Sequence, residues 1–220
     1  MKTIIFTLSC LLILLKAESQ NKSEKWNVGV HGGMTQYSGD LGQGWYSTKQ
    51  AIYGFGGVSV SRYLNKRFDA WVLLTRGQLG FQAQRDFSTN LDYNFRINLT
   101  TANVLLRYNL TSRESVFAPF LFLGGTVMKQ ETMETVIYSN RKKYVDFAVP
   151  TGGIGVHFRL GPFVSLQILE MFMYTLADDI DHRVSGANDM YLFHTVGLTF
   201  NIKKKEKMRN QNWKRVNVEE

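Results

Sequence analysis

Residues that could carry out chemistry are sparse in this sequence. The single cysteine, Cys10, lies in an apolar segment near the N-terminus, and the four histidines are spread along the chain: His31, His157, His182 and His194. A nucleophilic site needs a nucleophile, a base and an orienting group close together. His182 and His194 could meet Ser185 or Asp189, but no Gly-x-Ser-x-Gly turn, paired-carboxylate signature or phosphate-binding loop accompanies them. We therefore expect no catalytic residues and no enzymatic activity.

The segment LADDIDHRVSGANDM gathers side chains that could bind a cation: Asp178, Asp179, Asp181, His182 and Asp189. Calcium takes about six to eight oxygen ligands, so clustered carboxylates could bind it. The spacing does not follow the EF-hand pattern, however, and acidic residues in an exposed connection are ordinarily solvated. We expect no metal ion and no cofactor here.

The elements that must position all of these residues are predicted to be strands. Segments rich in Val, Ile, Leu, Thr, Phe and Tyr alternate with polar connections, and no stretch shows a sustained period of 3.6 residues. These segments are residues 26–37, 52–63, 68–81, 95–110, 117–128, 145–160, 163–176 and 191–202. The fold class is therefore all-β.

Short and long connections alternate between these strands, as in an eight-stranded antiparallel up-and-down transmembrane β-barrel. Within the last strand, Leu198 and Phe200 share an apolar face, while Thr199 and Asn201 share a polar one. A soluble barrel such as a lipocalin would turn its apolar face inward, and the period alone does not separate the two. Aromatic residues near the short connections favour an interfacial girdle of a membrane barrel: Trp26, Phe68, Trp71, Tyr108, Phe117, Phe158, Phe163 and Phe200.

Polar strand residues on the expected inner face could form a structural network in the lumen: His31, Arg76, Asn103, Arg107, His157 and Arg159. Buried arginines need partners, and Asp69 and Glu170 are the candidates. Glu170 shares its face with Leu166 and Ile168, so a bulge or a protein contact is needed to explain it. An eight-stranded barrel leaves room for little more than side chains, which favours a plugged interior over the alternative, a narrow pore or transport component.

The N-terminus has the features of a secretory signal. Lys2 precedes an apolar run at residues 4–15, and small residues at Ala17 and Ser19 fit signal peptidase cleavage. A retained helical anchor is disfavoured because the run is short, and a lipoprotein acylated at Cys10 would leave only residues 4–9 as the apolar stretch. We expect a signal peptide at 1–19, a barrel domain at 20–202 and a basic periplasmic tail at 203–220.

Positive charge is concentrated in the tail. The chain has a formal charge of +8, and residues 203–220 contain seven basic and three acidic residues. Without a basic face interleaved with aromatic residues, we expect no nucleic-acid partner. The tail could be solvated, could contact anionic headgroups, or could dock a periplasmic partner through a set that includes its single tryptophan: Lys203, Lys204, Lys205, Lys207, Arg209 and Trp213.

Several stretches together carry a family resemblance: WNVGVHGGMTQYSGDLG, APFLFLGG, AVPTGGIGVHFRL and MFMYTLADDIDHRVSGANDMYLFHTVGLTFNI. In this order they resemble the barrel half of the OmpA-like outer-membrane proteins of Bacteroidota. Related barrels without the peptidoglycan-binding domain are small subunits of the type IX secretion and gliding apparatus. The resemblance implies a Gram-negative outer-membrane location, contact with membrane lipid and lipopolysaccharide, and other envelope proteins as partners. Peptidoglycan anchoring is not implied, because the tail replaces the anchoring domain.

Overall fold

The computed structural model describes residues 26–38, 46, 52–82, 94–112, 115–135, 143–176 and 188–202. They form the predicted strands, joined into a closed barrel of eight strands in the order of the sequence. The strands are β1 (Trp26–Ser38), β2 (Tyr53–Tyr63), β3 (Phe68–Gln82), β4 (Asn94–Asn109), β5 (Phe117–Thr135), β6 (Lys143–Arg159), β7 (Val164–Thr175) and β8 (Met190–Ile202). The prediction of an eight-stranded antiparallel barrel is confirmed.

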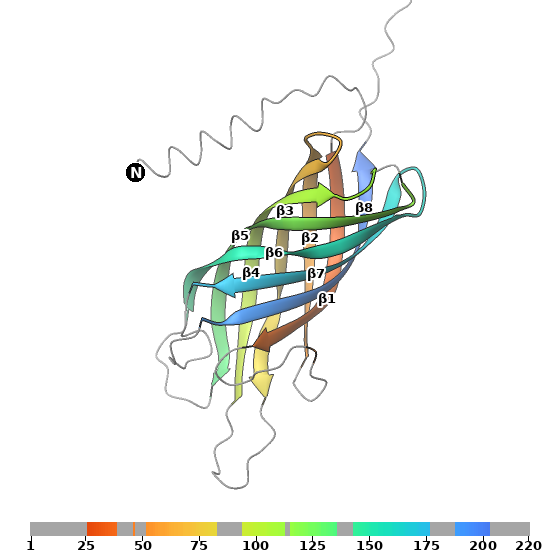
Figure 1. Cartoon of the computed structure of the whole chain (residues 1–220). Helices are drawn as coiled ribbons and strands as arrows, with labels where there is room; N and C mark the ends of the chain where they lie inside the picture. Colours follow the sequence, from red (N-terminus) through yellow and green to blue (C-terminus); the bar gives the residue numbers. More distant parts are fainter. Residues whose placement is uncertain are drawn as a thin grey trace, which may run out of the picture.

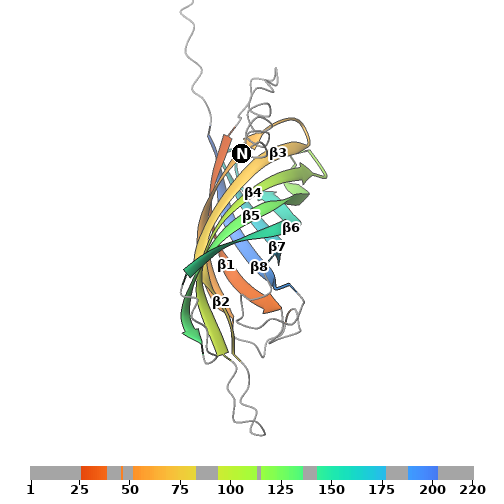
Figure 2. The same ribbon diagram turned by 90° about the vertical axis from the view of Figure 1, so that its left-hand side faces the viewer.

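Each strand pairs antiparallel with the next, and β1 pairs with β8 to close the barrel, with Trp26 opposite Ile202. Figures 1 and 2 show the strands tilted around the barrel, with the connections divided between its two ends. We call the end with Trp26, Ile202 and the connections 64–67, 110–116 and 160–163 the short-turn end. The opposite end is the long-loop end.

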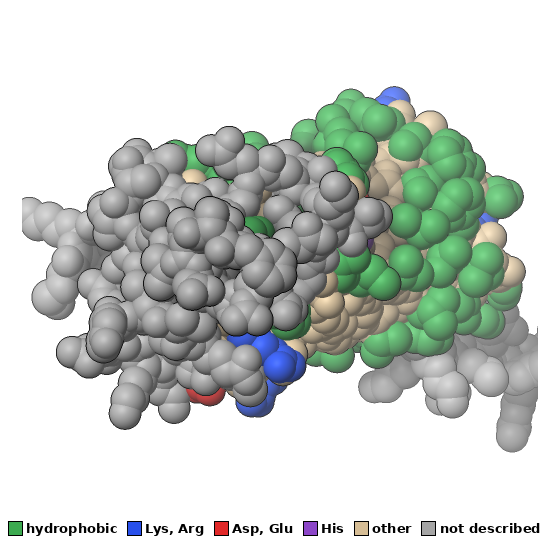
Figure 3. Space-filling model, turned by 90° about the horizontal axis from the view of Figure 1, so that it is seen from below, with side chains coloured by type: hydrophobic (Ala, Val, Ile, Leu, Met, Phe, Trp, Pro, Cys, Tyr) green, Lys and Arg blue, Asp and Glu red, His purple; other side chains and the backbone are tan. Residues whose placement is uncertain are grey.

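The outer wall of the barrel is apolar. In β8, Val196, Leu198 and Phe200 are 39–51% exposed, whereas Thr195 and Thr199 between them are buried. The same alternation runs along β3 and β4, and Figure 3 shows apolar side chains in green gathered on the outside of the barrel. The described part of the chain contains no helix with the length and apolar character needed to cross a bilayer.

Strand bounds differ from the sequence prediction mainly at β5. It extends to Thr135, beyond the predicted end at 128, and pairs with a β6 that begins at Lys143. The added residues are mostly polar, so they lack the alternation that reveals a strand. Their backbone groups are nevertheless paired across β4, β5 and β6, which makes the extension favourable.

Two features in β6 accommodate the curvature of the wall. The register shifts between Ala148 and Thr151, and Pro150 occupies this bulge, where a missing backbone N–H is tolerated. Farther along, a Cβ at Gly153 would overlap the carbonyl oxygen of Glu170 on β7. Glycine at this position therefore allows the two backbones to approach closely.

The lumen is filled by side chains in two zones. The short-turn half contains most of the buried polar groups, while the long-loop half is largely apolar. The expectation of a polar inner face therefore applies only to the short-turn half.

Trp71, which the sequence suggested for the girdle, is 2% exposed and points inward, because it alternates with the outward Val72. The other girdle aromatics remain on the outer wall, and two pairs of them pack with their rings tilted: Phe68 with Tyr108, and Phe117 with Phe158.

Candidate functional site

An ion pair spans the lumen wall near the short-turn end. Asp69 on β3 and Arg107 on β4 are opposite each other in register, and their side chains are 0% and 5% exposed. The Asp69 Oδ2 atom accepts from Arg107 Nη2 at 2.6 Å and Nε at 2.8 Å, and from Asn109 Nδ2 at 3.0 Å. The arginine charge is thus neutralised where water cannot easily reach it. Asp69 is the partner that the sequence analysis left undecided.

Aromatic rings enclose this ion pair. The guanidinium carbon of Arg107 lies 5.7 Å from the Trp71 ring and 5.2 Å from the Phe120 ring. Trp71 also meets Phe120 and Phe122 edge to face, with centroids 6.4 and 5.5 Å apart. We call Asp69, Arg107, Trp71, Phe120 and Phe122 the lumen plug.

A row of hydroxyls and one amide lies next to the plug. Thr75 and Thr101 hydroxyls are 2.7 Å apart, and Asn103 Nδ2 donates to Thr101 Oγ1 at 2.8 Å. Thr126 donates to Asn103 Oδ1 at 2.6 Å and lies 2.8 Å from the Thr151 hydroxyl. These contacts link β3 to β6 through satisfied groups, so the row stabilises the wall.

His31 on β1 contacts the plug from a neighbouring part of the lumen wall. Its Nε2 atom is 2.7 Å from the Ser59 hydroxyl, and its ring lies 6.2 Å from the Trp71 ring. A Cβ at Gly197 would overlap the His31 ring, so glycine on β8 makes room for it. His31 thus packs against the plug, and the Nδ1 atom has no hydrogen-bond partner among the described residues.

The remaining predicted lumen residues differ in their placement. His157 is partly buried and lies in register with the buried residues Ala118 and Gln167. Arg159 is exposed at the last residue of β6, at the mouth of the barrel. Arg76 is exposed on the outer wall, because it shares the face of the outward Val72 and Leu74. Its assignment to the lumen is therefore wrong.

Glu170 also lies on the outer wall, and a protein contact explains it. The Glu170 carboxylate is 2.9 Å from His194 Nδ1 on β8 and accepts from the Tyr46 hydroxyl at 2.7 Å. The Tyr46 ring packs against the His194 ring in a tilted arrangement, with centroids 5.6 Å apart, and the Tyr46 backbone N–H donates to Gln36 Oε1 at 3.0 Å. The hydrogen bond to Glu170 raises the pKa of Tyr46. This outer clasp of Tyr46, Glu170 and His194 had no signal in the sequence, since it joins residues from three distant segments.

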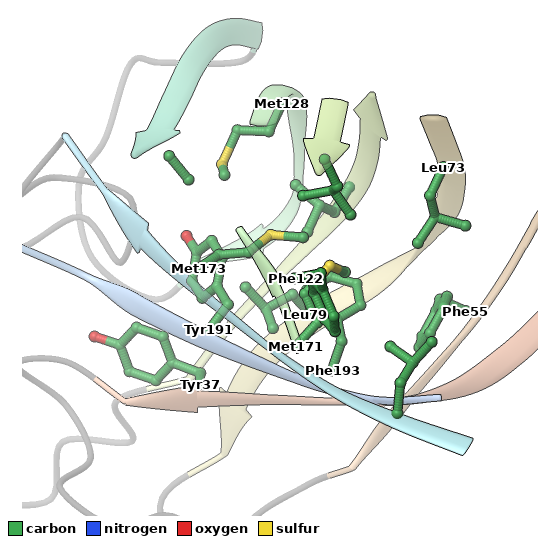
Figure 4. Packing of buried hydrophobic residues seen from close by; sticks show 14 of the residues in the cluster. Tyr37, Phe55, Leu73, Leu79, Phe122, Met128, Met171, Met173, Tyr191 and Phe193 are labelled. Atoms are coloured by element: carbon green, nitrogen blue, oxygen red, sulfur yellow. The ribbon is translucent and has the colours of Figure 1, made fainter. Parts of the chain in front are cut away.

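The long-loop half of the lumen is packed with apolar side chains. Figure 4 shows methionine and aromatic side chains from several strands pointing toward one another, among them Met128, Met171, Met173 and Phe193. All four are at most 1% exposed. At one edge of this cluster the Tyr37 hydroxyl donates to Asp189 Oδ1 at 3.0 Å.

The other sequence expectations concern residues outside those described. The tail set Lys203, Lys204, Lys205, Lys207, Arg209 and Trp213 lies there, as do Asp178, Asp179, Asp181 and His182 of the acidic segment. Within the described ranges, no group of three or more His, Cys, Asp or Glu residues could hold a metal ion.

Known proteins share this architecture. The model of the "Outer membrane protein beta-barrel domain" family matches residues 7–203. No curated protein gives a match. Among solved structures, Neisserial surface protein A is similar with a TM-score of 0.51 and 13% identity, covering 80% of this chain and 97% of that chain.

Two further barrels are comparable. Ail, the attachment invasion locus protein of Yersinia pestis, was solved with the heparin analogue sucrose octasulfate; it has a TM-score of 0.50 and 9% identity, covering 82% of this chain and 100% of that chain. AlkL, solved in DMPC bilayers, has a TM-score of 0.50 and 12% identity, covering 86% of this chain and 94% of that chain. These likenesses concern the fold. Because the family model spans the whole barrel, the chain belongs to the outer membrane protein beta-barrel domain family and is a β-barrel protein of the outer membrane.

Proposed function

We propose that this protein is a non-enzymatic structural or interaction barrel with a closed lumen, and a small subunit of a larger cell-envelope assembly. The observation that carries the proposal is the lumen plug, in which the Asp69–Arg107 pair is enclosed by aromatic rings. A barrel closed in this way acts through its outer surface, its long loops and its tail. Its short-turn end and both termini would face the periplasm, as in the OmpA-like barrels of Bacteroidota that the sequence resembles.

A closed lumen follows from the way the two zones are filled. Ions cross a channel only where polar groups and water replace their hydration shell. In the long-loop half, the cluster around Met171, Met173 and Phe193 is apolar and almost fully buried, and the buried polar side chains around it, such as Gln130 and Thr175, are fewer. In the short-turn half, the Asp69–Arg107 pair and the threonine row each form hydrogen bonds among their own members. This filling of both zones supports a lumen closed to hydrated ions.

The outer clasp supports a structural role for the outer wall. The Tyr46 hydroxyl donates a hydrogen bond to Glu170, and this contact raises the pKa of Tyr46. The Glu170 carboxylate is shared between this hydroxyl and His194, so both groups are engaged in holding Tyr46 against the wall. The clasp is therefore suited to fixing a loop residue.

Conductance in planar bilayers tests the closed lumen. We expect no steady single-channel openings from the wild-type protein. The double variant W71A/F120A removes two rings of the plug and should produce openings, whereas V72A/L121A, on the outer face of the same strands, should not. Steady wild-type openings that disappear on substitution of Arg107 would favour a narrow pore.

Isolation of complexes from native membranes in mild detergent tests the assembly role. The full chain should bring down a partner in stoichiometric amount. Removal of residues 203–220 should lower the yield of that partner if the tail provides the contact, and a tail with its lysines changed to glutamine separates charge from length. If neither the full chain nor the shortened chain brings down a stoichiometric partner, the assembly proposal fails.

A further inference from the structure

Basic side chains lie on the outer wall where the apolar surface ends toward the long-loop end. Arg76 follows the outward residues Val72 and Leu74 on β3, and Lys129 follows Val127 on β5. Arg96 lies toward the long-loop end of β4. We call Arg76, Arg96 and Lys129 the basic row. Figure 3 shows a group of Lys and Arg side chains in blue on this side of the barrel, with an Asp or Glu side chain in red close by.

The strand register brings two of these residues together. Thr100 on β4 pairs with both Arg76 and Lys129, so the two cations lie two strands apart on one line across the wall. At about 4.8 Å per strand, their backbones are about 10 Å apart. Both side chains can therefore reach one polyanionic headgroup.

Each member of the basic row keeps donors for a ligand. Arg76 forms no hydrogen bond or ion pair with any described residue. Lys129 Nζ contacts Glu131 Oε1 at 2.9 Å and its side chain is 53% exposed, which leaves two of its three N–H donors. An anion bound to Lys129 would lie close to the Glu131 carboxylate, which would repel it.

The Arg96 side chain is already fixed by contacts within the protein before any ligand binds. Its Nε and Nη2 atoms donate to Gln78 Oε1 at 3.2 and 2.5 Å, and its guanidinium carbon lies 5.5 Å from the Tyr53 ring. A guanidinium has five N–H donors, so others remain for a second acceptor. An arginine whose rotamer is already fixed loses less entropy when it binds an anion.

The charged side chains of the outer wall differ between β7 and β8 on one side and β3 to β5 on the other. On β7 and β8, the outward charged residues are Glu170 and His194, which contact each other. On β3 to β5 the basic row instead lies beside apolar residues that are 42–54% exposed: Val72, Leu74, Val104, Leu106 and Val127. A ligand with acyl chains can lie on this apolar surface while its headgroup reaches the basic row.

We propose that the basic row binds the phosphate groups of lipopolysaccharide in the outer leaflet. The proposal rests on the orientation given under the proposed function, in which the long-loop end faces outward. Charge complementarity selects an anion, and continuity with the apolar wall selects a lipid over an acidic protein or free phosphate. Charge-assisted hydrogen bonds from Arg and Lys to phosphate provide the specificity.

The experiment compares lipopolysaccharide binding by the full chain and two charge-matched variants. R76Q/K129Q removes two cations of the basic row, and R62Q/K66Q removes two at the short-turn end. Binding is measured in detergent by native mass spectrometry with phosphorylated lipopolysaccharide, dephosphorylated lipopolysaccharide and inorganic phosphate as separate probes. R76Q/K129Q should weaken binding about 30-fold, given the usual contribution of each basic residue near an anionic surface. R62Q/K66Q should stay within about twofold of the wild type.

Each outcome has a distinct meaning. Equal binding by R76Q/K129Q and the wild type overturns the site, and equal binding of dephosphorylated lipopolysaccharide overturns the phosphate contact. Release by millimolar inorganic phosphate would show that the site takes free phosphate. Loss of binding in R62Q/K66Q alone would overturn the proposed orientation. None of these outcomes affects the conductance test, so the closed lumen and the basic row succeed or fail separately.

Discussion

At the scale of single residues, Asp69 and Arg107 depend on each other for burial. Replacing Asp69 with alanine leaves the Arg107 guanidinium without its carboxylate in a site where it is 5% exposed. Stranding one buried charge in this way costs about 3 to 5 kcal/mol. We therefore expect D69A to lower the free energy of unfolding by this amount in urea titrations of protein folded into lipid vesicles.

The double variant D69A/R107M provides the control. Methionine keeps apolar contact with Trp71 and Phe120 and removes the stranded charge. The double variant should be more stable than D69A alone, because the uncompensated charge is gone. If the effects of the two single substitutions simply add, the two residues are not coupled.

Tyr46 provides a second prediction at this scale, through its ionisation. The hydrogen bond to Glu170 raises the pKa of Tyr46 above the ordinary value of 10.0. The contact is therefore fully present below pH 10 and is lost as the pH rises through the raised value. The ultraviolet titration of the wild type minus that of Y46F should show one phenol ionising above pH 10, and E170Q should move that ionisation back down. A difference curve centred at or below pH 10 would exclude the contact.

At the scale of strands, the alternation of residue types revealed the elements but not all side-chain directions. The strands were predictable because Val, Leu and Phe alternate with Thr, Gly and Asn where one face meets lipid. Trp71 was misassigned because an aromatic residue near a strand end suits either a girdle or a plug. The β5 extension and the apolar lumen zone lacked this alternation, so no periodic signal reported them. Arg76 was misassigned because a polar residue on the outer wall breaks the pattern.

The outer face of β4 provides the prediction that belongs to this scale. Val104 lies midway between Tyr108 and Thr100 and is 54% exposed. An arginine there should destabilise the folded barrel by about 2 to 4 kcal/mol, as expected at the middle of a bilayer. N98R, on the same face nearer the long-loop end, should cost about 0 to 1 kcal/mol. Equal, small costs in vesicle unfolding would indicate that this face does not contact lipid.

At the scale of the whole molecule, the protein separates three environments within one layer of strands. The outer wall contacts lipid, the short-turn half of the lumen contains most of the buried polar groups, and the long-loop half is largely apolar. The site residues could be predicted only in part, since Asp69 meets Arg107, and Glu170 meets His194, through the register between strands. A single sequence does not specify that register until the strands and their bulges are placed.

Two tryptophans report on this separation. Trp26 is 44% exposed on the outer wall, whereas Trp71 is 2% exposed inside the plug. In vesicles, a variant that keeps only Trp26 should be quenched by brominated lipid, because its ring faces the bilayer. A variant that keeps only Trp71 should resist both brominated lipid and aqueous iodide, since the wall shields it from one and the filled lumen from the other. Quenching of Trp71 by iodide would show an open lumen, and quenching by lipid would place its ring on the outer wall. Either result would contradict a barrel whose closed interior leaves only its surface and loops for function.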